Sequence, residues 1–273
     1  MPTQITTTES SNFEKVLRSA IELPGISINR VAFLRKELSK FFDDDVVEKA
    51  IEANPAQAGI STKILEQIAK ACINYETANV TGISAVAGVA GGWAMAATIP
   101  ADIAQFFGHI IRILQKLAYL YGWQEIFRDN NQDVLDDETS NQLTLFIGVM
   151  FGVNAANATI AKIAESIAIQ AEKTLVRKAL TQGTIYPIVK KIAKAIGIRM
   201  TKEIFAKSVG KIIPVVGAVV SGGITFVTFK PMSRRLQSYL ATLPMASVEL
   251  YKKSRNNAED VIDIDFSGIV VED

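Results

Sequence analysis

Histidine and cysteine are almost absent from this 273-residue chain, which contains one of each, His109 and Cys72. A Ser-His-Asp triad or a multi-histidine metal site would have to be built around that single histidine, so we expect neither a triad nor a bound metal. One cysteine cannot form an internal disulfide, which is typical of a reducing compartment. The first residues also lack the basic segment followed by an apolar segment that marks a secretory signal. These absences favour a cytoplasmic protein.

Motifs that hold nucleotides or activate nucleophiles are missing as well. The sequence contains no GxxxxGK[ST] loop, no GxGxxG, no HExxH and no GxSxG. We therefore expect no cofactor and no catalytic residues, which favours a protein that is not an enzyme. Cys72 lies on the apolar side of a predicted helix, where a thiol behaves as a small hydrophobic group.

Helical periodicity dominates what is present. Apolar residues recur at helical spacing through most of the chain, and no alternation long enough for a strand precedes residue 260. The sequence therefore predicts an all-α multi-helix bundle, with Gly- and Ala-rich apolar helices over residues 83–99 and 211–230 at its centre. We divide the chain into a flexible leader with a small helical cap (1–59), a main helical domain (60–245) and a flexible acidic tail (246–273).

Three helices are predicted in more detail. Ser27 is expected to cap the first, in which Arg30, Arg35, Lys36 and Lys40 face water and the apolar face consists of Val31, Leu34, Leu38, Phe41 and Phe42. Ser61 is expected to cap a long helix that Gly82 interrupts, with an apolar stripe of Ile64, Leu65, Ile68, Cys72 and Tyr75. A further helix is predicted from Pro100 to about Tyr121, with Gly122 at its end.

Small residues recur four positions apart in the most apolar segments, which places both members of a pair on one helix face: Gly88 with Gly92, Gly148 with Gly152, and Gly217 with Ser221. Such a face serves either helix association in a membrane or close packing in a soluble bundle. The uncharged stretch from Ile212 to Phe229 barely reaches the roughly 18–20 residues needed to span hydrocarbon, and Pro214 interrupts it. We therefore favour buried helices over inserted ones.

Charge is balanced overall, with 29 Lys and Arg against 28 Asp and Glu, but it is clustered locally. Residues 171–236 contain thirteen Lys and Arg and two Glu, a local charge of +11. These charges flank apolar helices without interleaved aromatic residues, a pairing that suits an anionic lipid surface better than nucleic acid. The alternative is a solvated basic face balanced by the acidic residues of segments 124–140 and 257–273.

Two blocks stand out by the order of their small, proline and charged residues. Residues 99–123 read IPADIAQFFGHIIRILQKLAYLYGW, and residues 198–229 contain Lys211 followed by IIPVVGA. Together they resemble the two signatures of the EcsC family of bacterial proteins, over roughly residues 60–245. The resemblance implies a helical domain, in some cases encoded beside an ABC transporter, without an established enzymatic activity. The positions that match the signatures are Asp102 and Lys211, together with Pro100, Gly122, Pro214 and Gly217.

These observations favour a non-enzymatic protein that docks to the inner face of the membrane, or to an integral membrane protein, through basic and apolar helices. The expected membrane-surface residues are Lys190, Lys191, Lys194, Arg199, Lys202 and Lys207. No nucleic-acid partner is expected, and a homo-oligomer is left open.

Two alternatives remain. The first is a soluble bundle that opens to insert an apolar hairpin into a membrane. The second is a lipid or small-molecule carrier, or a hydrolase, with an apolar cavity lined by Phe106, Phe107, Ile110 and Phe226 near Asp102 and His109. The candidate ligand-binding residues are Asp102, Phe106, His109 and Lys211. A histidine among apolar neighbours is more often a core or interface residue, and no second titratable partner lies close to it in the sequence.

Overall fold

A computed structural model describes residues 13–90, 101–127, 136–168, 188, 189, 192 and 228–253; it leaves out the side chains of 82–90, 101, 102 and 166. The elements in chain order are α2 (Arg30–Leu38), α3 (Asp44–Glu52), α4 (Thr62–Ala90), α5 (Ala101–Leu120), α6 (Asp137–Met150), α7 (Asn154–Ala168) and the short 3-10 helix η1 (Pro244–Ala246). Residues 13–21, 228–240 and 248–253 are also helical. These residues contain no strand, and the all-α prediction is confirmed.

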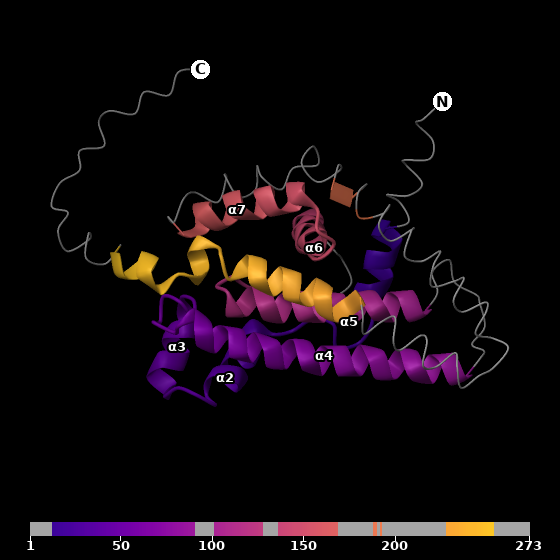
Figure 1. Ribbon diagram of the computed structural model, residues 1–273, viewed down its shortest axis with the longest axis horizontal. Helices are drawn as coiled ribbons and strands as arrows, with labels where there is room; N and C mark the ends of the chain where they lie inside the picture. Colours follow the sequence, from indigo (N-terminus) through magenta and orange to yellow (C-terminus); the bar gives the residue numbers. More distant parts are fainter. Residues whose placement is uncertain are drawn as a thin grey trace, which may run out of the picture.

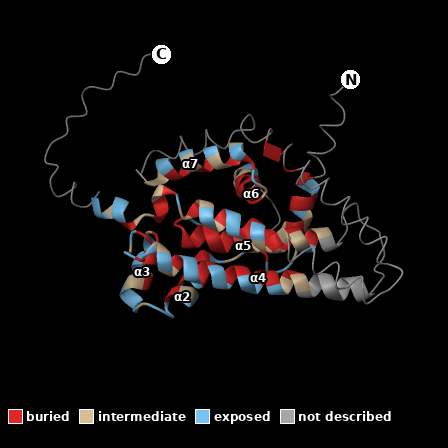
Figure 2. Ribbon diagram, in the orientation of Figure 1, coloured by how far each residue is buried: buried red, intermediate tan, exposed pale blue. Residues whose placement is uncertain are grey.

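α5 is the most deeply buried of the described helices. From Ile110 to Trp123 every residue except Arg112 is buried, and most of these residues are apolar, as expected of a helix in the core. α4 lies along one side of α5, and α6 and α7 lie on the other (Figure 1). α2 and α3 pack against each other near one end of α4, and α2 also contacts α5. Figure 2 shows the buried residues concentrated where these layers meet.

The Gly- and Ala-rich segments expected at the centre fall mostly outside this description. Residues 82–90 continue α4 but their side chains are not described, and residues 91–100 and 211–227 are not described at all. Gly82 was predicted to interrupt this helix, but α4 continues through it to Ala90. Among the described residues, no helix combines the length and the apolarity required to cross a membrane.

α5 ends at Leu120, close to the predicted end at about Tyr121, and Gly122 terminates it as the sequence predicts. Gly122 has a φ of 95°, and two backbone bonds close the helix: Trp123 N–H donates to the Ala118 carbonyl at 3.0 Å, and Gly122 N–H donates to the Tyr119 carbonyl at 3.3 Å. This pattern is the Schellman motif, in which the residue after the helix adopts the left-handed conformation that glycine tolerates best.

Gly152 ends α6 in the same way, with a φ of 77° and a bond from Val153 N–H to the Gly148 carbonyl at 2.8 Å. The prediction that Gly148 and Gly152 share a helix face is therefore wrong, because Gly152 lies beyond the helix. Gly148 does allow close packing, since a Cβ there would lie 2.7 Å from the Cβ of Ala156 in α7 and 3.0 Å from Ile188.

The face of α2 differs from the prediction. Asn29, and not Ser27, caps the helix by accepting a bond from Ala32 N–H at 2.8 Å. Val31 is 36% exposed and Phe41 is 53% exposed. The buried residues are Arg30, Phe33, Leu34 and Leu38.

Arg30, predicted to face water, is 4% exposed because it closes the C-terminal end of α3. Its Nη1 donates to the Ile51 carbonyl at 2.7 Å, its Nη2 donates to the carbonyls of Ala50 and Ala53 at 3.4 and 3.3 Å, and its Nε donates to the Trp123 carbonyl at 3.1 Å. The carbonyls at a helix C-terminus carry partial negative charge, so a buried cation is stabilised there. Arg30 thus joins α2, α3 and the end of α5.

Residues on both sides of the proposed domain boundaries share one core. Phe13, in the first helix, makes an edge-to-face contact with Phe107 of α5 at 6.4 Å between ring centroids. Asn54 Nδ2 donates to the Tyr251 hydroxyl at 2.9 Å, and Thr62 Oγ1 donates to the Ala246 carbonyl at 3.3 Å. Residues 254–273 of the acidic tail lie outside the described residues.

Replacing Arg30 with Lys is expected to lower the free energy of unfolding by roughly 2–3 kcal/mol, because one ammonium group cannot reproduce the bonds of the guanidinium to four carbonyls. The control is Arg35→Lys, since Arg35 forms an exposed pair with Glu48 at 2.6 Å, a kind of contact that contributes at most about 1 kcal/mol. Urea denaturation measures both. Equal losses in the two variants would contradict the role assigned to Arg30.

The variants Gly122→Ala and Gly59→Ala separate backbone strain from crowding. Both glycines have positive φ, but a Cβ at Gly122 would lie 3.2 Å from the Met245 carbonyl oxygen, whereas one at Gly59 would meet nothing within 4 Å. Left-handed strain alone costs roughly 1–2 kcal/mol. We expect Gly59→Ala to lose about that much in denaturation experiments and Gly122→Ala to lose clearly more; an equal loss would show that Met245 moves away freely.

Candidate functional site

Glu76 is a carboxylate on the buried face of α4. The described buried residues of this helix recur at helical spacing: Leu65, Ile68, Ala69, Cys72, Ile73, Glu76, Thr77 and Val80. The Glu76 side chain is 0% exposed. Tyr75, which was predicted to lie on this stripe, is 60% exposed. A charged group in such a position requires partners, because its transfer from water is costly.

The partners of Glu76 come from one face of α5. His109, Arg112 and Lys116 follow each other at intervals of three and four residues, which aligns them along the helix. His109 Nδ1 lies 2.8 Å from Glu76 Oε2, while Arg112 Nε and Lys116 Nζ donate to Oε1 at 3.2 and 2.7 Å. We call these four residues the Glu76 cluster. It links α4 to α5 where the two helices run side by side (Figure 1).

The cluster keeps Glu76 ionised. Burial alone would raise the pKa of this carboxyl group, but the hydrogen bonds from His109 and Lys116, with the charges of Lys116 and Arg112, outweigh burial and lower the pKa to about 2. An ionised carboxylate only accepts hydrogen bonds. The proton between Glu76 and His109 therefore belongs to Nδ1 of the imidazole.

This assignment gives His109 one defined tautomer when the ring is neutral: Nδ1 carries the proton and Nε2 carries a lone pair. A carboxylate that holds Nδ1–H in this way orients the ring and makes Nε2 the reactive nitrogen. Within the described residues, Nε2 has no hydrogen-bond partner, and the His109 side chain is 14% exposed.

The cluster also fastens the segment over residues 22–29 to α5. Arg112 Nη1 donates to the Gly25 carbonyl. Gln115, next to Lys116 and fully buried, donates to the Ile26 carbonyl at 2.8 Å and accepts from Ile28 N–H at 2.9 Å. Lys116 Nζ additionally lies 5.3 Å from the ring centroid of Tyr75, which allows a cation–π interaction. The Glu76 cluster thus lies at the junction of three segments.

The chemistry available at this junction is acid–base and electrostatic. A carboxylate–imidazole pair can act as a general base, but no described hydroxyl or thiol lies in hydrogen-bond contact with His109 Nε2. Burial raises the pKa of the Cys72 thiol to about 11, so this thiol stays protonated and unreactive near neutral pH. The described residues contain no group of three metal-ligating side chains.

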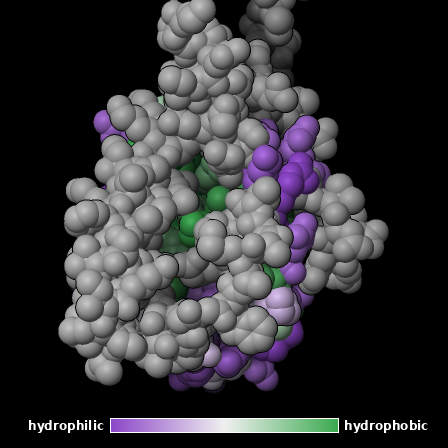
Figure 3. Space-filling model, turned by 90° about the vertical axis from the view of Figure 1, so that its right-hand side faces the viewer, coloured by the Kyte–Doolittle hydropathy of each residue, from purple (hydrophilic) through white to green (hydrophobic). Residues whose placement is uncertain are grey.

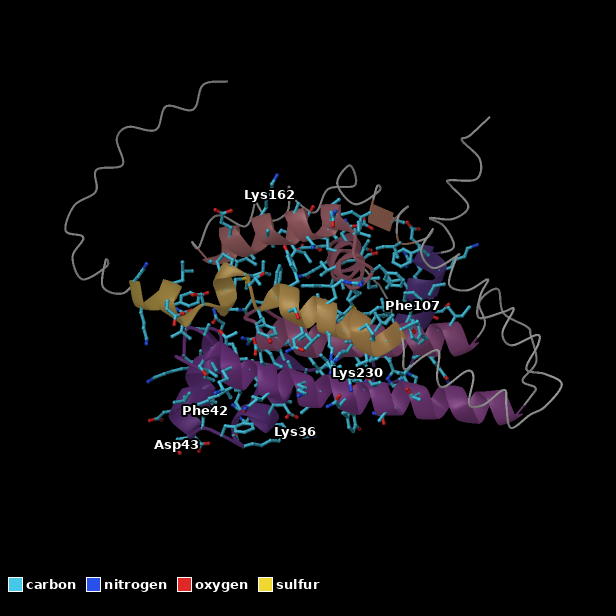
Figure 4. The ribbon with its side chains drawn as sticks, viewed as in Figure 1. Lys36, Phe42, Asp43, Phe107, Lys162 and Lys230 are labelled. Carbon is cyan, nitrogen blue, oxygen red and sulfur yellow. The ribbon has the colours of Figure 1, made fainter. Side chains whose placement is uncertain are left out.

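The residues predicted to bind a ligand are only partly placed. Phe106 is half-buried and contacts Phe107 and Phe229 edge-to-face, with ring centroids 5.9 and 6.1 Å apart. Phe107, labelled in Figure 4, lies in the core. His109 joins the Glu76 cluster. Asp102 belongs to α5, but its side chain is not described. Several predicted residues lie outside the described residues: Lys211, Phe226, Lys190, Lys191, Lys194, Arg199, Lys202 and Lys207.

Sequence reasoning missed Glu76, although two signals point to it. Glu76 is the acidic residue at a buried position of the α4 stripe, between Ile73 and Val80, and His109, Arg112 and Lys116 form a polar row on an otherwise apolar helix. A charge on each of two apolar faces suggests that the faces meet. The partner of His109 lies on another helix, 33 residues away in the sequence, so spacing within α5 does not reveal it.

Comparison with known proteins identifies no relative: no protein-family model, no curated protein and no solved structure matches this chain. The resemblance to the EcsC family therefore stays a prediction.

Replacing Glu76 with Gln is expected to reduce the loss of folding stability that occurs as the pH falls below about 4.5. The pKa of Glu76 is about 2 in the folded chain against 4.5 for a free carboxyl group, so the unfolded chain takes up the proton first as the pH falls. The stabilisation is complete above pH 4.5 and is lost between about pH 4.5 and pH 2, a change of roughly 3 kcal/mol.

Urea denaturation at several pH values across this window measures the slope. Wild type should lose stability steeply as the pH falls, and Glu76→Gln should be less stable at neutral pH with a shallower slope. The control Glu48→Gln removes an exposed carboxylate, paired with Arg35, and should keep the wild-type slope. A wild-type slope in Glu76→Gln would contradict the assigned ionisation.

Proposed function

We propose that this protein is non-enzymatic and docks onto an anionic membrane surface through residues 171–236. The observation that carries the proposal is the clustering of thirteen basic and two acidic residues in this segment, which also contains the apolar stretch from Ile212 to Phe229. Basic residues close to an anionic bilayer contribute about 1 kcal/mol each, and adjacent apolar residues add to the attachment.

The packing of Ile188, Val189 and Ile192 supports one part of this proposal. These three residues are buried, and a Cβ at Gly148 of α6 would meet Ile188 at 3.0 Å and Ile192 at 3.7 Å. Three of the residues predicted on the apolar side of segment 184–196 are therefore in the core. Helical periodicity then predicts that the interleaved Lys190, Lys191 and Lys194 lie on the opposite side, toward solvent.

The C-terminal part of the basic segment has a different use. Arg235 Nη1 donates to the Met150 carbonyl at 2.6 Å, at the C-terminal end of α6, where a cation is favoured. Lys230 is half-buried (labelled in Figure 4). Lys230 and Arg235 are therefore not counted in the proposed docking surface, and its principal residues remain the six predicted from Lys190 to Lys207.

Basic side chains elsewhere in the described residues are interspersed with acidic ones. On the face shown in Figure 3, the hydrophilic residues gather along one side, and hydrophobic residues are visible near the middle. Arg35 pairs with Glu48, and Lys40 pairs with Glu37. Such mixed pairs give little net attraction to an anionic surface, which makes the one-sided segment the stronger candidate.

Vesicle flotation tests the proposal with two triple variants of equal charge change. Lys190→Gln, Lys191→Gln and Lys194→Gln together should reduce partitioning onto anionic vesicles by on the order of 100-fold. The control combines Lys36→Gln, Lys63→Gln and Lys70→Gln, three exposed lysines outside residues 171–236. Its partitioning onto anionic vesicles should stay near that of wild type. Wild-type binding should also fall as salt shortens the Debye length from about 10 Å at 0.1 M to about 3 Å at 1 M.

Equal binding of wild type to neutral and anionic vesicles would overturn the proposal, as would an equal loss in both triple variants. Binding to native membranes that protease treatment abolishes, without binding to pure lipid, would replace the lipid surface with an integral membrane protein as the partner.

A further inference from the structure

The Glu76 cluster contains more positive charge than its carboxylate neutralises. Glu76 contributes one negative charge, whereas Arg112 and Lys116 contribute two positive charges before His109 is counted. The Arg112 side chain is 26% exposed, whereas those of His109 and Lys116 are mostly buried, with 14% and 11% exposed. A ligand would therefore reach the outer side of the cluster through Arg112.

The cationic side chains also keep unused donors. A guanidinium has five N–H groups and an ammonium has three. The structure uses Nε and one Nη1–H of Arg112 for Glu76 and Gly25, and one N–H of Lys116 for Glu76. Among the described residues, no acceptor takes the Nη2 donors of Arg112 or the other protons of Lys116. Glu76 meanwhile holds both side chains in place, so little conformational entropy is lost when they bind.

We propose that Arg112, Lys116 and protonated His109 bind a phosphate-type anion, and that binding takes up one proton from solvent at His109 Nε2. Neutral His109 presents an Nε2 lone pair, which repels an anion. The imidazolium instead donates from both nitrogens, to Glu76 through Nδ1 and to the anion through Nε2. The anion thus supplies the negative charge that Glu76 alone does not.

The charged groups around His109 come from several elements. Glu76 is contributed by α4, and Arg112 and Lys116 by α5. Glu37 of α2 and Lys40, two residues after this helix, lie close enough to influence Cys72, one turn before Glu76, but they are paired with each other. The segment 22–29 contributes the Gly25 carbonyl to Arg112.

This site is independent of the docking surface, because it uses none of the lysines from Lys190 to Lys207. The ligand could be a soluble phosphorylated molecule or the phosphate of a lipid headgroup. Both offer a tetrahedral anion that accepts several hydrogen bonds from a guanidinium and an ammonium.

Isothermal titration calorimetry of the full chain with sulfate is the primary test. Sulfate does not titrate between pH 6 and pH 8, so any proton taken up on binding is taken up by the protein. We expect one saturable site per chain, tighter binding at pH 6 than at pH 8, and proton uptake that appears as a dependence of the heat on the buffer. Glycerol 3-phosphate in solution and phosphatidate in vesicles then distinguish the soluble source from the lipid source.

His109→Asn is the decisive variant. An Asn amide can replace Nδ1–H as donor to Glu76 but has no counterpart of Nε2, so the fold is preserved while the anion loses one donor. We expect sulfate to bind about tenfold more weakly and without proton uptake. Arg112→Gln should weaken binding at least as much, whereas the control Arg35→Gln, an equal charge change at an exposed pair, should not.

Three results would overturn the proposal: no saturable sulfate binding to wild type, binding without proton uptake, or wild-type affinity in His109→Asn. An equal loss in Arg35→Gln and Arg112→Gln would also overturn it, because it would show attraction by net charge alone. If Arg112→Gln proves too unstable to titrate, His109→Asn decides the question by itself.

Discussion

A fully buried carboxylate is the constraint on which the arrangement of α4 and α5 depends. Glu76 has no exposed surface, and its ionised form is tolerated because three donors from one face of α5 meet its two oxygens. Removing any of them would take a hydrogen-bond donor from a carboxylate that has no contact with water, which is costly. The register of α4 against α5 is therefore tightly restricted. The segment over residues 22–29 is restricted as well, since it is bound to α5 through Arg112 and Gln115.

Arg30 follows the same physical logic with the opposite charge. It is buried where the carbonyls of α3 and of Trp123 converge, so the end of a helix supplies the compensation that Glu76 receives from side chains. Apolar packing supplies most of the driving force for such a core but is not directional, whereas these two groups accept few geometries. In this protein the buried charges, more than helix propensity, determine which helix faces meet.

Local rules predicted what is local. The all-α fold followed from helical periodicity. The termination of α5 by Gly122 followed from the preference for glycine at positions with a left-handed backbone conformation. Gly152 was misassigned because a glycine after a helix and a glycine within a small-residue face look the same in sequence. Arg30 was predicted to face water because charged residues on a helix usually do. The carbonyls at the end of α3 that accept its hydrogen bonds cannot be inferred from the sequence around Arg30. The pairing of Glu76 with His109 depends on the register of two helices joined through residues 91–100, which no local pattern specifies.

An ionised, buried Glu76 holds His109 in one tautomer, and this tautomer can be observed directly. The chain has a single histidine, so a long-range 1H–15N correlation spectrum of the imidazole can be assigned without ambiguity. Above the pH at which the ring loses its charge, the spectrum should show Nδ1 protonated and Nε2 bare. A ring protonated at Nε2, or the mixture of tautomers found in an unrestrained imidazole, would contradict the account.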